Sequence, residues 1–158
     1  MFWKILIVLL ISMIPMIELR GAIPIAVGMD LGLPGWLVLI VAIIGNIIPV
    51  PIIYFFARKV LDWGTKCKWK PFKQFCNFCL KKGEKGGKKL LEKTGKYGTY
   101  FALFLFVAVP VPGTGAWTGT LAASILNLDF KKTMIAIIAG VLTAGLIMLF
   151  ASKVILGG

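Results

Sequence analysis

The sequence predicts an all-α integral membrane protein built as an inverted repeat, in which each half holds a re-entrant helical hairpin followed by a transmembrane helix. First, 59% of the 158 residues are hydrophobic, compared with about 45–50% in a typical soluble domain. Second, four apolar stretches alternate between one that prolines interrupt and one long enough to span a bilayer. Third, a lysine-rich segment separates the two halves. We therefore expect a single membrane domain over residues 1–158.

The apolar stretches near residues 2–30 and 97–128 are predicted to turn back at a proline-containing break. As a helix, the arm 99–109 would be about 16 Å long, which is roughly half of the ~30 Å hydrocarbon core. Each hairpin would then reach the middle of the bilayer and return to the face it entered, with fully spanning arms as the alternative. Irregular backbone at that depth must be buried in protein or line a wet cavity.

The stretches near residues 35–58 and 132–156 are long enough to cross as single helices, since about 20 residues suffice. One crossing in each half inverts the second half relative to the first. A shift of 95 positions places Pro15 on Pro110 and Gly45 on Gly140, which supports the repeat. The predicted boundaries are residues 1–61 for the first repeat, 62–96 for a basic linker and 97–158 for the second repeat.

The linker carries most of the net charge of +12, because 13 of the 18 basic residues lie between Arg58 and Lys96. A loop on the cytoplasmic side explains this better than nucleic-acid binding. Its apolar residues follow helical spacing, and Pro71 suits a first helical turn. They are Phe72, Phe75, Cys76, Cys79 and Leu80. We expect an amphipathic helix on the inner leaflet that meets anionic headgroups, weakened by the glycines at 83, 86 and 87. The alternative is a helix packed on the protein's own loops.

These features predict a multi-pass protein of the plasma membrane, with the linker in the cytoplasm and both termini outside. No A-x-A-like cleavage site follows residues 1–17, so we expect this segment to be retained. The chain has three cysteines and no histidine, which argues against a metal site, and no cofactor is expected. No catalytic constellation is present, so we do not expect an enzyme. Two spans shield two hairpins poorly, which favours a homodimer.

Glu18 and Arg20 are the closest acid–base pair within an apolar segment. Charges at this depth are costly and usually face a cavity or a partner, so we place both residues at the first break, with Pro24 beside it. Arg20 would hold an anionic group, and Glu18 would couple transport to protons or sodium. Two alternatives stay open: a structural ion pair that closes the hairpin, and two side chains that reach water at the outer interface.

The second break is the counterpart of the first and carries no charge. Its free amides and threonine hydroxyls could line a polar pocket, and a helix beginning there would favour an anion. Trp117 would pack the hairpin tip or contact a lipid chain. Alternatively, it is a turn satisfied by neighbouring helices. Asn46, in the first span, either bonds a hairpin tip or joins two helices. The candidate residues of the second break are Pro110, Pro112, Gly113, Thr114, Gly115, Trp117 and Thr118.

The segments Glu18-Leu-Arg-Gly-Ala-Ile-Pro24 and Pro110-Val-Pro-Gly-Thr-Gly-Ala-Trp-Thr-Gly-Thr-Leu-Ala-Ala123 resemble the small multi-drug export proteins. The resemblance covers nearly the whole chain. That family is in turn similar to the DedA, or SNARE-associated (VTT), membrane proteins. This second resemblance implies paired re-entrant hairpins and movement of lipid carriers such as undecaprenyl phosphate.

The first functional hypothesis is a transporter or lipid translocase for an amphipathic anion such as a polyprenyl phosphate. The second is a multidrug exporter of lipophilic cations, with Glu18 as the counter-ion. The third is a membrane scaffold that transports nothing and recruits anionic lipid or protein partners through its basic helix.

Overall fold

The computed structural model describes residues 1–15, 17–111 and 114–156. These residues form seven α-helices and no strand. The helices are α1 (Phe2–Met13), α2 (Glu18–Gly28), α3 (Gly35–Ile47), α4 (Pro49–Thr65), α5 (Lys70–Ala108), α6 (Ala116–Ile125) and α7 (Phe130–Leu156). Two apolar helical segments, Gly35–Thr65 and Phe130–Ile155, are long enough to cross a membrane. The prediction of an all-helical chain with two such segments is confirmed.

The first broken stretch forms a hairpin of α1 and α2. Helix α1 stops because Ile14 precedes Pro15 and is extended, with φ −71° and ψ 129°, as residues before proline usually are. The arms have 12 and 11 residues. At a rise of 1.5 Å per residue, each arm is about 17–18 Å long, too short to cross the hydrocarbon core alone.

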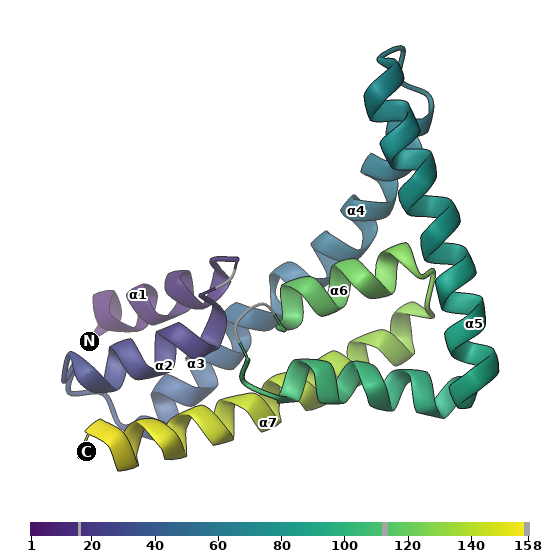
Figure 1. The fold of residues 1–158 in the computed structure, drawn as a ribbon. Coiled ribbons are helices and arrows are strands. Elements are labelled where there is room, and N and C mark those ends of the chain that lie inside the picture. The colour runs from purple at the N-terminus through teal and green to yellow at the C-terminus, as the bar shows by residue number, and fades with distance from the viewer. Residues whose placement is uncertain (16, 112–113, 157–158) are drawn as a thin grey trace.

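The second hairpin consists of the last part of α5 and the whole of α6. Gly95 separates this part of α5 from the preceding helix, because its φ of 68° and ψ of 172° are not helical. In Figure 1 the closed ends of the two hairpins point toward each other from opposite ends of the body. Helix α7 runs along both hairpins, and the two chain termini lie at the same end (Figure 1).

The first long segment is two helices in one path. Ile48 ends α3 and begins α4 with helical angles, φ −50° and ψ −47°. Pro49 and Pro51 lack amide hydrogens, so the regular ladder is interrupted here without a sharp turn. The predicted span ended near residue 58, whereas α4 continues to Thr65 and leaves the body (Figure 1).

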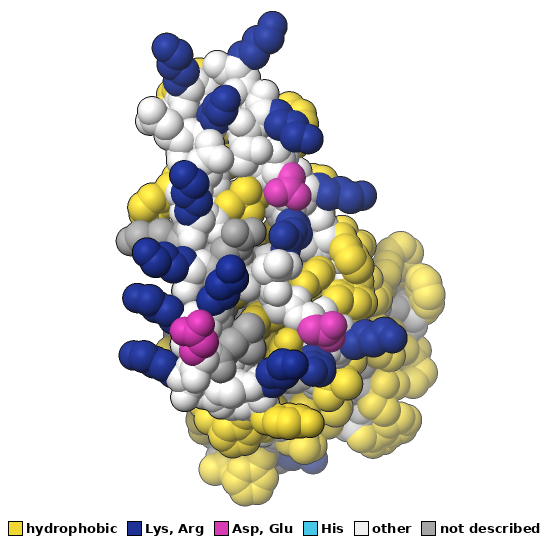
Figure 2. Space-filling view, turned by 90° about the vertical axis from the view of Figure 1, so that its right-hand side faces the viewer, with side chains coloured by type: hydrophobic (Ala, Val, Ile, Leu, Met, Phe, Trp, Pro, Cys, Tyr) yellow, Lys and Arg dark blue, Asp and Glu magenta, His cyan; other side chains and the backbone are white. Residues whose placement is uncertain are grey.

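The linker forms a protruding arm in which the end of α4 packs against the start of α5. Gly64 allows the contact, because a Cβ there would lie 2.9 Å from the Phe72 ring and overlap the Cys76 sulfur. Lysines cover the arm, and hydrophobic side chains gather on the body behind it (Figure 2). The helix does not break at the glycines 83, 86 and 87, because α5 runs through all three and bends at Gly95 instead. Whether these glycines weaken the helix stays a prediction.

The two halves end their second hairpin arms in the same way. Asp30 and Asn127 both have left-handed backbone, with φ of 42° and 57°. The next residue in each half, Leu31 or Leu128, donates its amide to a carbonyl five residues earlier. This is the hydrogen-bond pattern of a Schellman helix ending. Such a match lies in backbone geometry and is independent of the shared apolar composition.

Candidate functional site

Glu18 caps the start of α6 from the other half of the chain. Its carboxylate accepts hydrogen bonds from the amides of Ala116 at 3.3 Å and Trp117 at 3.0 Å. The first amides of a helix have no partner within it, and the helix dipole favours a negative charge beside them. The N-cap residue Gly115 has no side chain to fill this role, so Glu18 supplies the missing cap. Glu18 is 4% exposed.

Arg20 binds the C-terminal end of a different helix, α5. Its guanidinium donates to the carbonyls of Val107 at 2.9 Å, Val109 at 3.0 Å and Val111, and to the Thr114 hydroxyl at 3.2 Å. Carbonyls at a helix C-terminus lack partners and favour a cation. We call these contacts, together with those of Glu18, the clasp. Each charged side chain bonds a helix end of the second hairpin, and Glu18 also acts electrostatically on Arg20. The structural alternative for this pair stays a prediction.

Two backbone features accompany the clasp, a positive φ at Glu18 and a close approach at Gly115. Glu18 has a φ of 51°, and a left-handed conformation costs a non-glycine residue about 1–2 kcal/mol. Gly115 has no side chain because the carboxylate needs the space: an added Cβ would overlap the oxygens of Glu18. Strained backbone of this kind often occurs at functional sites, which supports the assignment of this region as the candidate site.

A cavity of about 200 Å³ adjoins the clasp. Its walls come from both breaks and include Pro15, Glu18, Arg20, Gly115, Trp117, Thr118 and Leu121. A larger apolar groove of about 380 Å³ lies between α4, α6 and the start of α5. Trp117 and Leu121 line both spaces. The indole N–H of Trp117 is buried and has no hydrogen-bond partner among the described residues.

The predicted site residues are of three kinds: those in the clasp or the cavity wall, those elsewhere in the described structure, and those outside the described residues. Six of them lie in the clasp or line the cavity, namely Glu18, Arg20, Thr114, Gly115, Trp117 and Thr118. Pro110 lies in the second break, after the end of α5, whereas Pro24 lies inside α2 and does not line the cavity. Asn46 is buried on α3, away from the cavity lining, and its amide oxygen has no partner in the described structure. Pro112 and Gly113 lie outside the described residues.

A second polar contact between the halves was not predicted. The Tyr54 hydroxyl on α4 donates to the carbonyl of Leu128, and the Ser124 hydroxyl on α6 donates to the carbonyl of Tyr54 at 2.8 Å. Arg58 also donates to the side-chain oxygen of Asn127. A buried tyrosine usually finds a partner for its hydroxyl. A tyrosine hydroxyl within an apolar segment was therefore the available signal.

One family model matches this chain, over residues 18–147, and its description is "Putative small multi-drug export protein". The match includes the whole of the clasp and most of the second span. This chain belongs to that family.

As a small multi-drug export family member with two long apolar helices, the chain is a membrane protein. Its family name associates it with export. No curated protein and no solved structure matches it significantly. The further resemblance to DedA proteins therefore stays a prediction.

Proposed function

We propose that this protein exports lipophilic cations and that Glu18 is the counter-ion that receives them. The observation that carries the proposal is the division of hydrogen-bonding capacity in the clasp. Arg20 has little left to offer a ligand, whereas the Glu18 carboxylate retains acceptor capacity beside the cavity. The family name, which refers to drug export, supports the same class of activity.

The capacity of Arg20 is largely used by the protein itself. A guanidinium has five N–H donors, four of them on its two terminal nitrogens. Those nitrogens already make four hydrogen bonds, to three carbonyls and one hydroxyl. An anionic headgroup would have to displace these contacts, and the Val107 carbonyl would lose the donor that Arg20 supplies. The carbonyls of Val109 and Val111 would keep donors from their own segment. This cost disfavours the hypothesis of a polyprenyl phosphate held by Arg20.

Glu18 has the opposite balance. Each carboxylate oxygen accepts one amide, and a carboxylate offers about four acceptor positions in all. A cationic or donor headgroup in the cavity can therefore bind without removing the cap. The Trp117 ring in the wall adds an aromatic surface for a cation, and its indole N–H would suit an acceptor atom on the same ligand.

The neighbouring groove gives such a ligand a place for its apolar part. Since Trp117 and Leu121 line both spaces, a headgroup beside Glu18 could extend its hydrocarbon into the groove along α4 and α6. The apolar surface that such a ligand buries contributes roughly 25 cal/mol of binding free energy per Å². In the proposed cycle, release of the cation is coupled to protonation of Glu18.

The same proposal includes a topology of two re-entrant hairpins related by an inverted repeat. The short arms, the facing closed ends of the hairpins and the matching Schellman endings support it. A shift of 95 positions also carries the first residue of α3 onto the first residue of α7. A membrane-impermeant thiol reagent should label Cys67 only in permeabilised cells, and a cysteine at Phe2 in intact cells. The reverse pattern would contradict this topology.

The transport test uses proteoliposomes with an imposed pH gradient and ethidium as the lipophilic cation. We expect the wild-type protein to accelerate ethidium movement and proton flux, and Glu18→Gln to abolish both. Glutamine keeps an acceptor oxygen for one amide, so the variant retains part of the cap. The matched control is Asp30→Asn, which neutralises an exposed acid of the same half outside the cavity, and should transport normally.

Two results would overturn the proposal. If a polyprenyl phosphate equilibrates between leaflets in an Arg20-dependent manner while ethidium does not move, the substrate is an anion. The scaffold hypothesis is favoured by a different pair of results. Neither compound moves with a well-folded protein, and substitutions of the lysines in the protruding linker arm alter the cell phenotype.

A further inference from the structure

A second open groove lies away from the clasp, between the last part of α5 and the start of α7. Its volume is about 620 Å³, and it shares no lining residue with the clasp cavity or its apolar groove. The groove begins next to Gly95, where the chain turns from the arm into the second hairpin. It is therefore a separate feature, and its role does not depend on the proposed transport activity.

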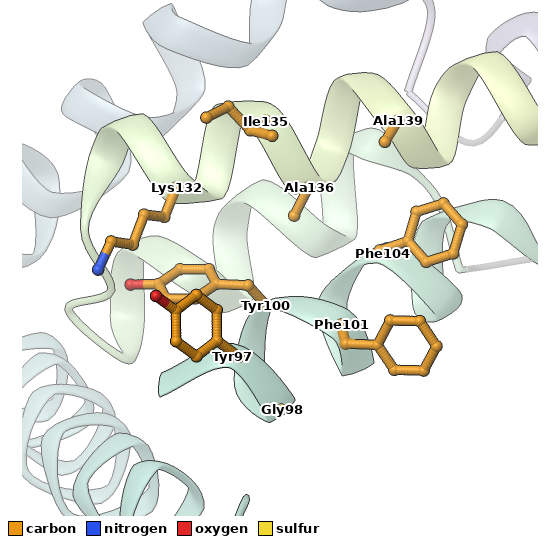
Figure 3. A pocket seen from close by; sticks show the side chains of 9 residues that line it. All are labelled: Tyr97, Gly98, Tyr100, Phe101, Phe104, Lys132, Ile135, Ala136 and Ala139. Atoms are coloured by element: carbon orange, nitrogen blue, oxygen red, sulfur yellow. The ribbon is translucent and has the colours of Figure 1, made fainter. Parts of the chain in front are cut away.

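The groove is amphipathic along its length. Figure 3 shows the Lys132 amine and the hydroxyls of Tyr97 and Tyr100 together at one end, with Phe101 and Phe104 toward the other. The walls beyond the polar end consist of apolar side chains of α5 and α7. From Lys132 to Ala139 the α7 wall is about 10 Å long, at 1.5 Å per residue. This is the shape and polarity of a lipid lying against a helix pair.

The charge at the polar end selects the type of lipid. The Lys132 ammonium lies 5.8 Å from the centre of the Tyr100 ring, and no acidic partner binds it among the described residues. The nearest acid in sequence, Asp129, accepts the Lys132 backbone amide at 3.0 Å and so caps the start of α7. Tyr100 accepts the Asp129 amide at 3.0 Å, which leaves its own O–H free to donate.

Tyr97 indicates where the groove lies relative to the bilayer surface. It is 91% exposed, and tyrosine side chains concentrate where a membrane meets water. Its place beside Lys132 puts the polar end of the groove at headgroup level and the phenylalanines at acyl-chain level.

We propose that this groove binds one anionic phospholipid, with its phosphate at Lys132 and the two tyrosine hydroxyls and an acyl chain along Phe101, Phe104 and Ala139. A zwitterionic lipid offers the same chain but a neutral headgroup. The site should therefore distinguish the two lipids by headgroup alone.

The test is native mass spectrometry of the full-length protein in neutral detergent, after incubation with equal amounts of phosphatidylglycerol and phosphatidylcholine carrying identical chains. We expect one tightly held lipid, with phosphatidylglycerol favoured about fivefold, which is what one lysine near an anionic surface supplies. Lys132→Gln should remove the preference. The matched control is Lys131→Gln, a change of an exposed neighbour that does not line the groove, and it should retain the preference.

A second pair of variants tests the acyl-chain part. Ala139→Phe fills the groove and should reduce binding of both lipids, whereas Leu146→Phe, on an exposed part of α7 outside the groove, should leave both unchanged. The proposal fails if the wild type binds both lipids equally. It also fails if Lys131→Gln acts as strongly as Lys132→Gln, or if Ala139→Phe binds lipid like the wild type.

Discussion

Replacement of Gly115 by alanine tests the clasp with a single methyl group. The backbone at Gly115 is extended, with φ −130° and ψ −169°, which any residue adopts. On backbone grounds alone, Gly→Ala at such a position stabilises a protein by about 0.4–1 kcal/mol, because the unfolded chain loses freedom. The new Cβ would, however, overlap the Glu18 carboxylate, so we predict the opposite sign.

The magnitude follows from the hydrogen bonds that the methyl group displaces. Glu18 accepts two amides, and a hydrogen bond to a charged group contributes about 1.5–3 kcal/mol. Partial relaxation will keep some of this interaction, so we expect Gly115→Ala to destabilise the protein by about 2–4 kcal/mol. Unfolding in mixed micelles with increasing dodecyl sulfate, followed by helical circular dichroism, measures the change. Gly35→Ala is the control, because its added methyl would meet only the flexible ends of Leu149 and Lys153, at 3.2 and 3.3 Å.

A double-mutant cycle decides whether the overlap with Glu18 is the cause. In a Glu18→Ala background the atoms that the new methyl meets are gone, so Gly115→Ala should cost no more than about 0.5 kcal/mol. If the two costs add instead, the methyl acts elsewhere and the account of the clasp is wrong.

Three further predictions concern the contacts of Arg20, the contact of Tyr54 and the bend at Gly95. Arg20→Lys should destabilise by about 2–3 kcal/mol in the same unfolding assay, since an ammonium cannot fork toward all the carbonyls at the end of α5; wild-type stability would contradict the cap. Tyr54→Phe should cost about 1–2 kcal/mol because the carbonyl of Leu128 loses its donor, whereas Tyr97→Phe, at an exposed site, should change stability by less than about 0.5 kcal/mol. Gly95→Ala should cost about 1–3 kcal/mol through the backbone alone, because φ 68° with ψ 172° is a conformation that almost only glycine adopts. Apart from its neighbours along the chain, no described atom lies within 4 Å of the added Cβ. A spin-label distance across the bend will report whether α5 also straightens.

The local features of the fold were accessible from the sequence. Prolines at 15 and 110 predicted both breaks, because a residue before proline avoids helical angles and Ile14 does so here. The lengths of the apolar stretches predicted which segments form long helices. Glu18 and Arg20 were predicted to lie in the first break, because charges in an apolar segment need a partner or a cavity. The structure places both in the first turn of α2, directly after the break, so this part of the prediction is wrong.

The partners of those charges were not accessible. Glu18 binds amides 98 and 99 positions away, and no local pattern encodes a contact at that separation. Gly115 was a partial signal, because a glycine directly before a helix often marks a close approach. The bend at Gly95 was missed for a related reason. Every glycine in the linker has the same intrinsic freedom, and only tertiary packing decides which one adopts a left-handed angle.

The clasp also sets an order of events during synthesis. Both charged residues belong to the half that leaves the ribosome first, and the helix ends that they cap follow almost a hundred residues later. At about 5–20 residues per second, this delay is roughly 5–20 s. During that interval Glu18 and Arg20 have no helix ends to bind, which favours their remaining in water or under an insertion factor. Both charged side chains therefore reach their partners only after the second hairpin has been made.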